Sequence, residues 1–501
     1  MKEVELKFQV PPGRRAALAQ AVAGRTDRQG MRQRTRLRAA YWDMPDRALA
    51  QALLALRVRR EGRVWVQTLK GVGNDGMTRL EHNVPLPPDA ASAVPPADPA
   101  LHAGTPVGER LLAVLAKQAP GAALQLQYRT DVLRLGRSVK SRLGRVELAL
   151  DEGRIEAADR RLPLYELEIE LKSGSPLAVI AAARRWLPRF GLWLDTRSKA
   201  ERGDLLSRGE TAAPARLAQP VALTREMSPA QARLEVLRSC ADQVCRNASQ
   251  VASGTHASEH VHQLRVGLRR LRCALALFGA GEHDTALAAA AASMFRRLGA
   301  ARDQAVLQSA VVNDIEAALR SAGADSGVPV PSPSPVAEAA TDVVRSPASQ
   351  ALLLDLLAAV VETPRDDVPD RTLPRLFKRR LKAWYRRAAA DALRYAELDD
   401  EGRHRLRKQV KRLRYAVEFG SALFEPRRVR RFVLPLRALQ DRLGALADVA
   451  MATDAYRAAL PADPRSWFAL GWLAARRDAL VDQSIAELEA FARAKRFWTR
   501  N

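Results

Sequence analysis

The chain has 501 residues, more than a single hydrophobic core usually organises, so at least two domains are expected. Its formal net charge of +25 predicts a polyanionic partner, which could be nucleic acid, an anionic membrane surface or a phosphate polymer. Aromatic residues make up only 5% of the chain, which disfavours a binder of single-stranded nucleic acid because such proteins stack bases on aromatic rings.

The cysteines and the N-terminal residues both favour a cytoplasmic protein. Cys240, Cys245 and Cys273 are odd in number and lack Cys-x-x-Cys spacing, as expected in a reducing compartment. The first residues, MKEVELKFQV, include acids and no apolar stretch of the kind found in signal peptides. Uncharged apolar runs fall well short of the roughly 18 residues that would cross a membrane. We therefore expect a cytoplasmic protein with no membrane partner.

Residues 1–205 mix strand-like and helix-like patterns, which predicts an α+β domain. Alternation of apolar and polar side chains with a period of two indicates strands. The predicted strands are Glu3–Val10, Leu54–Arg60, Val64–Lys70, Arg79–Val84, Thr130–Leu135, Arg145–Leu150 and Leu164–Lys172. The Pro- and Ala-rich stretch Pro85–Pro106 is expected to be a loop that separates two halves of this domain.

Several of these strands carry charges of both signs along one face. Because alternate residues of a strand share a face, Glu3, Glu5 and Lys7 lie together. A solvated face explains any single strand more simply, but rows of carboxylates repel one another unless cations lie opposite. A closed barrel with acids on one wall of its lumen and cations on the other would resolve that conflict. Such a lumen suits a complex of a divalent metal with a polyphosphate. The other charged faces are those of Arg57 with Arg59 and of Glu166, Glu168, Glu170 and Lys172.

The order of these motifs resembles the CYTH, or triphosphate tunnel metalloenzyme, superfamily. Glu3-x-Glu5-x-Lys7 is similar to its ExExK signature, and the resemblance extends over about residues 1–205. It implies an eight-stranded antiparallel tunnel barrel with flanking helices. Further matching segments are Tyr41–Asp43, Leu56–Arg59, Gln67–Gly71, Arg79 with Glu81, Arg129–Thr130 with Arg134, Val146–Glu147 with Asp151 and Gly153, Glu166–Lys172 and Ser198–Gly203.

The resemblance also implies roles for individual side chains and a reaction. Mg²⁺ or Mn²⁺ would be held by Glu3, Glu5, Asp151, Glu168 and Glu170. The catalytic cations that grip the phosphates would be Lys7, Arg57, Arg59, Lys70, Arg134 and Lys199. Glu81 and Glu166 share the required strand faces, with a less defined role. The implied reaction is hydrolysis of inorganic triphosphate to pyrophosphate and phosphate. Relatives of the barrel act on thiamine triphosphate or cyclise ATP to cyclic AMP, and these activities stay open as alternatives.

Beyond an expected linker at residues 206–221, the pattern changes to long helical runs rich in Ala, Leu and Arg. Residues 222–501 are therefore predicted to be an all-α domain, divided by a Pro/Ser-rich connection near residues 323–335. This domain contains an internal repeat, which predicts two copies of one helical unit. The matching segments are His262–Arg272 with His404–Arg414, and Leu298-Gly299 plus Asp303 with Leu443-Gly444 plus Asp448.

Each copy of the repeat predicts a helix with one apolar face and one cationic face. The segment Arg403–Arg414 holds seven Arg or Lys residues and no acid, so a polyanion partner explains it better than a solvated face. The histidines lack further ligands at metal-site spacing, which favours phosphate contact or helix packing. The predicted phosphate-polymer residues are His262, Arg265, Arg269, Arg270 and Arg272 in the first copy, and His404, Arg407, Lys408, Lys411, Arg412 and Arg414 in the second.

The duplicated helical region resembles the CHAD domain, an α-helical domain often fused behind CYTH domains. The resemblance covers about residues 222–501 and implies two four-helix bundles related by a pseudo-twofold axis. It also implies a basic surface that binds long-chain polyphosphate. We therefore expect inorganic triphosphate and long-chain polyphosphate as partners, in preference to nucleic acid, and an association with polyphosphate granules. A non-catalytic scaffold for such granules stays open as an alternative, and the oligomeric state is not predicted.

Overall fold

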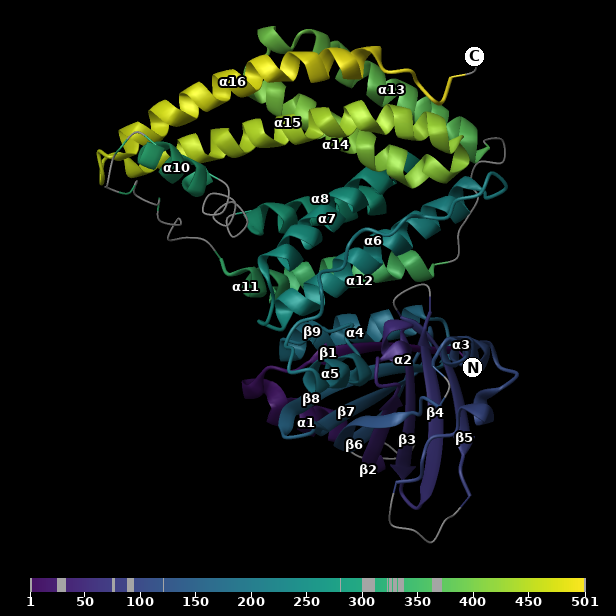
Figure 1. Cartoon of the computed structure of the whole chain (residues 1–501). Coiled ribbons are helices and arrows are strands. Elements are labelled where there is room, and N and C mark those ends of the chain that lie inside the picture. The colour runs from purple at the N-terminus through teal and green to yellow at the C-terminus, as the bar shows by residue number, and fades with distance from the viewer. Residues whose placement is uncertain are drawn as a thin grey trace. The chain divides into compact units, whose positions relative to one another are not determined.

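The computed structural model describes residues 2–24, 33–73, 77–87, 94–119, 121–279, 281–299, 311–321, 323, 327, 331, 338–362 and 372–499 (Figure 1). The chain divides into two compact units. The first unit comprises Met1–Leu217, Ala241–Leu264 and Val344–Glu362, and the second comprises Ala218–Cys240, Arg265–Val343 and Thr363–Asn501. The first unit therefore includes helical segments that lie beyond the expected linker. The domain limits at residues 205 and 222 stay predictions.

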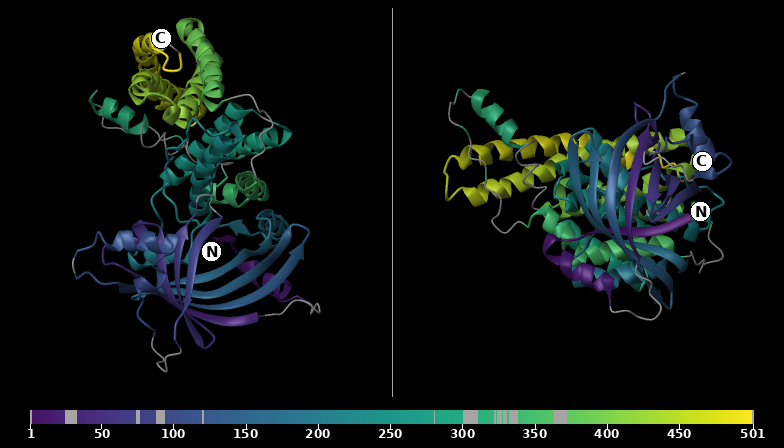
Figure 2. Two further views of the ribbon diagram at one scale, coloured as in Figure 1. Left: turned by 90° about the vertical axis from the view of Figure 1, so that its right-hand side faces the viewer. Right: turned by 90° about the horizontal axis from the view of Figure 1, so that it is seen from below.

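A nine-stranded antiparallel sheet forms the centre of the first unit, in the order β5-β4-β3-β2-β6-β7-β8-β1-β9. β1 also pairs with β5, so the first eight strands close into a barrel, as the sequence predicts (Figure 2). The short strand β9 lies outside this closure and pairs with β1. The strands are β1 (Lys2–Gln9), β2 (Gln33–Asp43), β3 (Leu54–Glu61), β4 (Val64–Val72), β5 (Thr78–Pro85), β6 (Gln125–Ser141), β7 (Gly144–Ala157), β8 (Arg160–Gly174) and β9 (Trp193–Leu194).

All seven predicted strands exist, and those of the second half are longer than predicted. β6 and β7 extend by pairing continuously from Arg129 with Glu156 to Ser141 with Gly144, and this cross-strand pairing overrides the weak local pattern. β2 was not predicted, because its arginines at positions 34, 36 and 38 obscure the alternation of polar and apolar residues. β9 was not predicted either, because it has only two residues. The expected loop Pro85–Pro106 contains a short 3₁₀ turn, η2 (Pro99–His102), in its described part.

Helices cover the outside of the barrel and close one end of its lumen. α2 (Ala48–Gln51) and α3 (Pro106–Leu115) pack Leu49 and Leu111 into an apolar cluster with β3 and β4. α4 (Leu177–Phe190) contacts β1, β7 and β8, and α1 (Arg15–Ala23), which follows the 3₁₀ turn η1 (Pro12–Arg14), contacts β6 and β7. α5 (Lys199–Ser207) packs against a cluster of Tyr41, Tyr128, Ile155 and their neighbours. Strand parity places this cluster on the same face as Arg134 and Asp151, so α5 plugs an apolar end of a charged lumen.

The predicted all-α region is confirmed from α6 through α16. Helices α13, α14, α15 and α16 contact one another in a closed cycle and form a four-helix bundle. The arrangement of the earlier helices as a second such bundle stays a prediction. The helices are α6 (Pro229–Ala252), α7 (Ser258–Phe278), α8 (Glu282–Arg297), α10 (Asn313–Ser321), α11 (Ala340–Arg345), α12 (Pro347–Val361), α13 (Leu373–Leu393), α14 (Asp400–Gly420), α15 (Pro426–Ala459) and α16 (Ser466–Arg493), with short 3₁₀ turns η4 (Tyr395–Glu397) and η5 (Ser421–Leu423).

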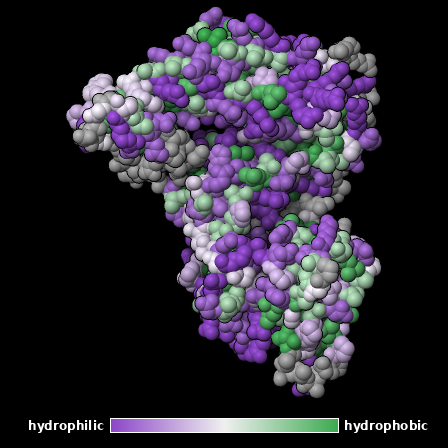
Figure 3. Space-filling view, viewed as in Figure 1, coloured by the Kyte–Doolittle hydropathy of each residue, from purple (hydrophilic) through white to green (hydrophobic). Residues whose placement is uncertain are grey.

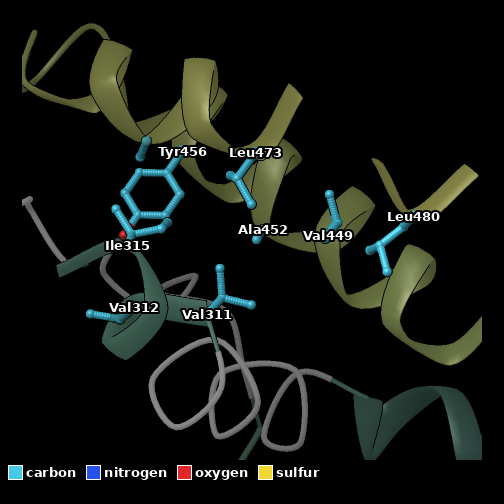
Figure 4. Close-up of a cluster of buried hydrophobic side chains, with 9 residues drawn as sticks. Val311, Val312, Ile315, Val449, Ala452, Tyr456, Leu473 and Leu480 are labelled. Atoms are coloured by element: carbon cyan, nitrogen blue, oxygen red, sulfur yellow. The ribbon is translucent and has the colours of Figure 1, made fainter. Parts of the chain in front are cut away.

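The short helix α10 is anchored by an apolar cluster rather than by charge. Val311, Val312 and Ile315 pack against Tyr456 of α15 and Leu473 of α16, all of them buried (Figure 4). Burying side chains of this size typically contributes roughly 1.5–3 kcal/mol each, which holds α10 at this end of the α15–α16 pair. Within the described residues, none of the helices has both the length and the apolarity required of a membrane span.

Candidate functional site

Strand register assembles charged side chains from four neighbouring strands inside the barrel. Lys7 of β1 lies opposite Glu168 of β8, and Asp151 of β7 lies opposite both Arg134 of β6 and Glu166 of β8. Each of these residues occupies the strand face that alternates with a buried apolar one, such as Leu150 or Leu167 on the opposite side. The predicted mixture of acids and cations on one face is therefore observed as direct cross-strand pairing.

Asp151, Glu166 and Glu168 form a carboxylate cluster. One oxygen of each lies within 4.8 Å of the others, and the three residues are between 0% and 7% exposed. Lys199 Nζ lies 2.7 Å from Asp151 Oδ2, 2.5 Å from Glu166 Oε1 and 2.9 Å from Glu168 Oε1. Arg134 forms a bidentate pair with Asp151, with both N–O distances 2.7 Å, and its guanidinium also contacts Glu168. Lys199 and Arg134 thus each contact more than one of the three buried carboxylates.

The pKa shifts in the carboxylate cluster follow from these contacts. Burial alone would raise the pKa of Glu168, but Lys199, Arg134 and Lys7 hold it well below its usual range. Burial would lower the pKa of Lys199, and the cluster of Asp151, Glu166 and Glu168 raises it instead. Glu168 is therefore an ionised carboxylate at neutral pH, the form in which a carboxylate binds a metal ion.

The plug helix α5 delivers two cations to the carboxylate cluster. Lys199 is its first residue, and Arg202, one turn later, contacts Glu166 and is itself buried. Ser198 caps the helix by accepting a hydrogen bond from the Glu201 amide at 3.0 Å. A Cβ at Gly203 would come 2.3 Å from the Tyr128 ring, so the helix can approach the strand only because glycine stands there.

A second group of charges lies on β1, β4 and β5. Lys70 Nζ is 2.6 Å from Glu3 Oε2 and 2.9 Å from Glu81 Oε2. Burial acts to raise the pKa of Glu81, but Lys70, a hydrogen bond with Glu3 and Arg57 lower it to about 2. Glu81 thus belongs with the predicted site residues as a second carboxylate that faces Lys70.

The remaining predicted acids lie apart from the carboxylate cluster. Glu5 contacts Lys7, and Arg79 Nε lies 3.2 Å from its Oε1. Glu170 shares Lys172 with Glu147, each at 2.8 Å. Burial, with smaller contributions from Glu3 and Glu147, raises the pKa of Glu170 although Lys172 acts to lower it.

The two lumen arginines of β3 differ in their surroundings. The pKa of Arg57 is raised because Tyr41, Glu81 and Glu3 outweigh its burial. The pKa of Arg59 is lowered by burial and by the neighbouring Arg57, although Arg59 also pairs with Glu61. Arg59 is therefore the member of the predicted cation set whose charge its surroundings stabilise least.

The structure brings some of the predicted site residues together and places the others in adjoining groups. Asp151, Glu168, Lys7, Arg134 and Lys199 come together, whereas Glu3 with Lys70, and Glu170, lie in adjoining groups. Glu166, for which strand parity indicated a less defined role, is a member of the carboxylate cluster. Glu147 and Arg202 had no assigned role. Glu147 could have been found from strand parity, because it alternates with Leu148. Arg202 depends on how α5 enters the barrel, which no local pattern indicates.

The donor set of the carboxylate cluster fits a hard divalent cation. Asp151, Glu166 and Glu168 offer only oxygen ligands, which suit Mg²⁺ or Mn²⁺ and disfavour soft metals. The predicted metal residues Glu3, Glu5 and Glu170 lie on strands β1 and β8 of the same lumen. Which of these acids bind an ion stays a prediction.

In the helical half, the apolar faces of the repeat are confirmed. Leu264, Leu268, Leu271 and Leu275 of α7 are at most 1% exposed, and so are Leu406, Val410, Leu413 and Val417 of α14. The predicted core stripes therefore pack as expected. In the space-filling view, hydrophilic residues predominate on the visible surface of α13–α16 (Figure 3).

The cationic stripes of the two repeats approach one another. Arg269 Nε of α7 donates to the Tyr415 hydroxyl of α14 at 3.3 Å, and the guanidinium groups of Arg265 and Arg269 lie 4.6 and 5.3 Å from the centre of the Phe295 ring. Burial, followed by Arg407 and Arg269, lowers the pKa of Lys411 to about 7, although Asp448 acts to raise it. Positive charge from both repeats thus accumulates around one lysine.

Each repeat also has a Leu-Gly…Asp motif, and residues of both motifs interact with the cationic stripes. Arg265 Nη1 donates to the Gly299 carbonyl at 3.2 Å, and Asp448 acts electrostatically on Lys411. Asp303, the first-copy counterpart of Asp448, lies outside the described residues, as does most of the predicted connection at residues 323–335. In both copies of the repeat, a residue of the Leu-Gly…Asp motif therefore interacts with a residue of the cationic stripe.

Individual members of the predicted stripes differ in exposure. Arg270 is 2% exposed, with its guanidinium 5.1 Å from the centre of the Phe419 ring, so it belongs to the interior. Arg412 stacks 3.9 Å over Trp384, and Arg414 pairs with Glu418 and Gln440. His404, Lys408 and Arg272 are exposed, and His262 and Arg407 are partly buried. Phosphate binding by these residues stays a prediction.

Comparisons with known proteins agree with both halves. A family model described as the CYTH domain matches residues 1–203, and one described as the CHAD domain matches residues 235–457. An inorganic triphosphatase of Haemophilus influenzae is 30% identical over 210 residues, which are 41% of this chain and 55% of that protein. The matched region therefore spans only about half the length of this curated relative.

Two solved structures are similar to parts of the chain. The CHAD domain from the plant Ricinus communis is 28% identical and covers 57% of this chain and 99% of its own, with a TM-score of 0.47. HpAC1 from Hippeastrum, described as having a dominant triphosphatase activity, is 16% identical and covers 42% of this chain and 97% of its own, with a TM-score of 0.29. Since both scores are below 0.5, the family matches alone carry the assignment. The chain therefore consists of a CYTH domain over residues 1–203 followed by a CHAD domain over residues 235–457.

Proposed function

We propose that the barrel is a divalent-metal-dependent hydrolase that cleaves inorganic triphosphate to pyrophosphate and phosphate. The carboxylate cluster of Asp151, Glu166 and Glu168, surrounded by Lys and Arg inside a closed barrel, is the observation that supports this most directly. The relative described as an inorganic triphosphatase supports the same substrate class.

Positioning and charge neutralisation account for most of the catalysis in phosphoryl transfer, and this lumen offers both. Asp151, Glu166 and Glu168, with Glu3, Glu5 and Glu170, are the acids that would hold Mg²⁺ or Mn²⁺. When bound, the ion would neutralise phosphate charge and polarise the bridging oxygens. Lys7, Lys70, Arg57, Arg59, Arg134 and Lys199 would bind the phosphate oxygens.

The attacking water and the leaving group make different demands on these side chains. An ionised carboxylate such as Glu168 can accept a hydrogen bond from water and orient it for in-line attack. The water oxygen bonds to the terminal phosphorus as the phosphoanhydride bond breaks, and pyrophosphate leaves with the bonding electrons. Lumen cations such as Arg57 and Lys70 would stabilise that developing charge.

The alternative substrates share this chemistry. A tunnel lined by carboxylates and guanidinium groups recognises the triphosphate part of thiamine triphosphate and of ATP equally well. Phosphate release from tripolyphosphate, thiamine triphosphate and ATP, together with cyclic AMP formation, should be measured with Mg²⁺ and with Mn²⁺. We expect the highest kcat/KM for tripolyphosphate. A preference for thiamine triphosphate or ATP would move the proposal to that alternative.

A pair of carboxylate variants tests whether the lumen performs the hydrolysis. Glu168→Gln should lower kcat at least about a hundred-fold, because it removes one negative charge from the carboxylate cluster. Asp131→Asn is the matched control, since Asp131 pairs with Arg36 on the outer face of β6. It should stay within about two-fold of the wild type, as expected for an exposed ion pair. Full activity of Glu168→Gln would refute the assignment.

The helical half is proposed to bind long-chain polyphosphate and to associate the protein with polyphosphate granules in the cytoplasm. The accumulation of positive charge around Lys411 supports this, because a polyanion would offset the charge that Arg407, Arg269 and Arg414 place near that lysine. Duplex DNA remains a competitor that also contacts cations through phosphate. Competition between long-chain polyphosphate and duplex DNA at matched salt should favour polyphosphate. A purified chain that binds polyphosphate but hydrolyses no triphosphate would support the scaffold alternative.

A further inference from the structure

β9 lies at the edge of the barrel sheet, so one of its edges has no neighbouring strand. Side chains from helices accept hydrogen bonds from the backbone amides on that edge. On its inner edge it pairs with β1, with Leu194 opposite Phe8, and the next amide, that of Asp195, donates to the Lys7 carbonyl at 2.9 Å. On its outer edge, the Leu194 amide donates to Gln350 Oε1 of α12 at 2.8 Å. The Thr196 amide donates to Ser249 Oγ of α6 at 2.9 Å. Two side chains therefore take the place of a further strand.

Both acceptors are buried and fixed in orientation. Gln350 is 3% exposed and its Nε2 donates to the Val344 carbonyl at 2.8 Å, which leaves Oε1 directed to the Leu194 amide. Ser249 is 1% exposed and its hydroxyl donates to the Cys245 carbonyl at 2.8 Å, which leaves a lone pair for the Thr196 amide. Replacing either buried acceptor should cost free energy, because the backbone amide would lose its hydrogen-bond partner and water could not take its place.

Further contacts hold the same segment from the helical side. Arg345 of α11 lies 4.1 Å over the Trp193 ring while its Nε donates to the Ala252 carbonyl at 2.7 Å. Arg246 of α6 lies 3.3 Å from Glu201 of α5. All of these residues belong to the first compact unit, in which α4 also packs on α12 (Figure 1).

The segment held in this way leads directly to the carboxylate cluster. Three residues after Thr196, Lys199 begins α5 and places its ammonium among Asp151, Glu166 and Glu168. Since Ser198 caps the same helix, a shift of the 194–196 backbone moves the helix start and Lys199 with it. Gln350 and Ser249 are thus connected to Lys199 through two hydrogen bonds from backbone amides to their side chains, the short segment 194–198 and one helix cap.

We propose that Gln350 and Ser249 are positioning residues for Lys199, so that the helical half is needed to set the geometry of the barrel's site. This inference rests on the proposed phosphohydrolase function, because it assumes that the position of Lys199 matters for turnover. It implies that the barrel does not reach full activity by itself. The helical half would then contribute structure to the site in addition to any binding of polyphosphate.

The test uses the full chain with three variants. Gln350→Met keeps the shape of the side chain and removes the acceptor, Ser249→Ala removes the hydroxyl, and Ser249→Thr retains it. Asp355→Asn is the matched control, because Asp355 also lies on α12 but pairs with the exposed Arg184 at 2.6 Å. We expect Gln350→Met and Ser249→Ala to lower kcat for tripolyphosphate roughly ten-fold, the scale of losses seen for supporting residues at metal sites. Ser249→Thr and Asp355→Asn should stay within about two-fold.

Two further measurements separate positioning from a general loss of stability. In a Lys199→Ala background, Gln350→Met should cause no additional loss of kcat if it acts through Lys199; an equal loss in both backgrounds would overturn the proposal. Hydrogen exchange at the amides of residues 193–202 should be faster in Gln350→Met than in Asp355→Asn. Unchanged exchange would also overturn it. Exchange does not depend on turnover, so an inactive wild type would refute the proposed function and leave this inference testable.

Discussion

Lys199 in the barrel and Lys411 in the helical half are both largely withdrawn from water, yet their surroundings shift their pKa values in opposite directions. Three carboxylates contact Lys199 and raise its pKa despite burial. Around Lys411, burial and the guanidinium groups of Arg407, Arg269 and Arg414 lower the pKa to about 7, with Asp448 opposing them. The charge of Lys199 is thus compensated by carboxylates, whereas Lys411 lies near several groups of its own charge.

If the proposed functions hold, this contrast corresponds to two ways of binding a phosphate chain. In the barrel, a metal–phosphate complex would replace existing Lys–carboxylate and Arg–carboxylate pairs. The cations would then pair with phosphate oxygens and the carboxylates with the metal ion. In the helical half, a polyanion would add negative charge beside Lys411, where Arg407, Arg269 and Arg414 act together to lower the pKa of the lysine. We expect the first arrangement to favour catalysis on a defined substrate and the second to favour binding of long polymers.

The strongest test of compensation is to remove the central cation of the barrel. Lys199→Met should destabilise the first unit by about 3 kcal/mol, because it leaves part of a buried carboxylate cluster without its partner. Denaturant unfolding in the presence of a chelator should show the lower free energy of unfolding. Added Mg²⁺ or Mn²⁺ should restore much of that free energy by supplying a replacement cation.

Lys172→Met is the comparison variant for this experiment. Lys172 pairs with Glu147 and Glu170 but its side chain is 33% exposed, so the loss should be below about 1 kcal/mol. If Lys199→Met unfolds at the same denaturant concentration as the wild type without metal, compensation of the carboxylate cluster is not what stabilises the barrel.

Two neighbouring histidines of the first unit, His82 and His102, offer a smaller test of how buried polar groups find hydrogen-bond partners. Gln67 Nε2 lies 3.0 Å from His102 Nε2 and can only donate to it, so the proton of the neutral His102 ring is on Nδ1, which lies 2.9 Å from His82 Nδ1. Burial, with a contribution from His82, lowers the pKa of His102 to about 4. Protonating His102 would place two donors against each other at Gln67.

Acid should therefore weaken the barrel through His102. Because the folded pKa of about 4 lies below the ordinary histidine value of about 6.5, the unfolded chain binds more protons between these values. The free energy of unfolding should fall on the order of 1–3 kcal/mol as the pH drops through that window. His102→Asn should be less stable at pH 7 and show a flatter profile from about pH 6.5 to 4. An unchanged slope in the variant would show that other groups dominate.

The sequence predicted the fold of each half because charge and hydrophobicity alternate so regularly. Glu3, Glu5 and Lys7 indicated an inward charged face, and the Leu stripe of α7 indicated a buried one, as the structure confirms. Local patterns are sufficient there, since strand and helix periodicities depend on neighbouring residues only.

What could not be predicted depends on contacts between distant segments. Arg270 belongs to a run of arginines, and its burial depends on contacts with distant residues such as Phe419 and Ser239. Gln350 and Ser249 have ordinary positions in their helices, and their roles depend on the free edge of β9, more than 50 residues away from either. Arg202 likewise reaches Glu166 only because α5 enters the barrel. Tertiary contacts of this kind leave no periodic signal in the sequence.

The smallest expected effect concerns the titration of Lys411. Its ammonium loses a proton as the pH rises through about 7, so the affinity for long-chain polyphosphate should fall roughly three- to ten-fold between pH 6 and 9, the scale of one lost phosphate contact. His404 on the same helix has a pKa lowered by burial and by Lys408, Arg407 and Lys411, so it is mostly neutral above pH 6.5 and adds little at the alkaline end. Lys411→Arg should keep its charge and bind with a flatter pH dependence, whereas Lys411→Met should bind weakly throughout. Binding isotherms at constant salt would measure this, and an equally steep decline in Lys411→Arg would show that a different group titrates.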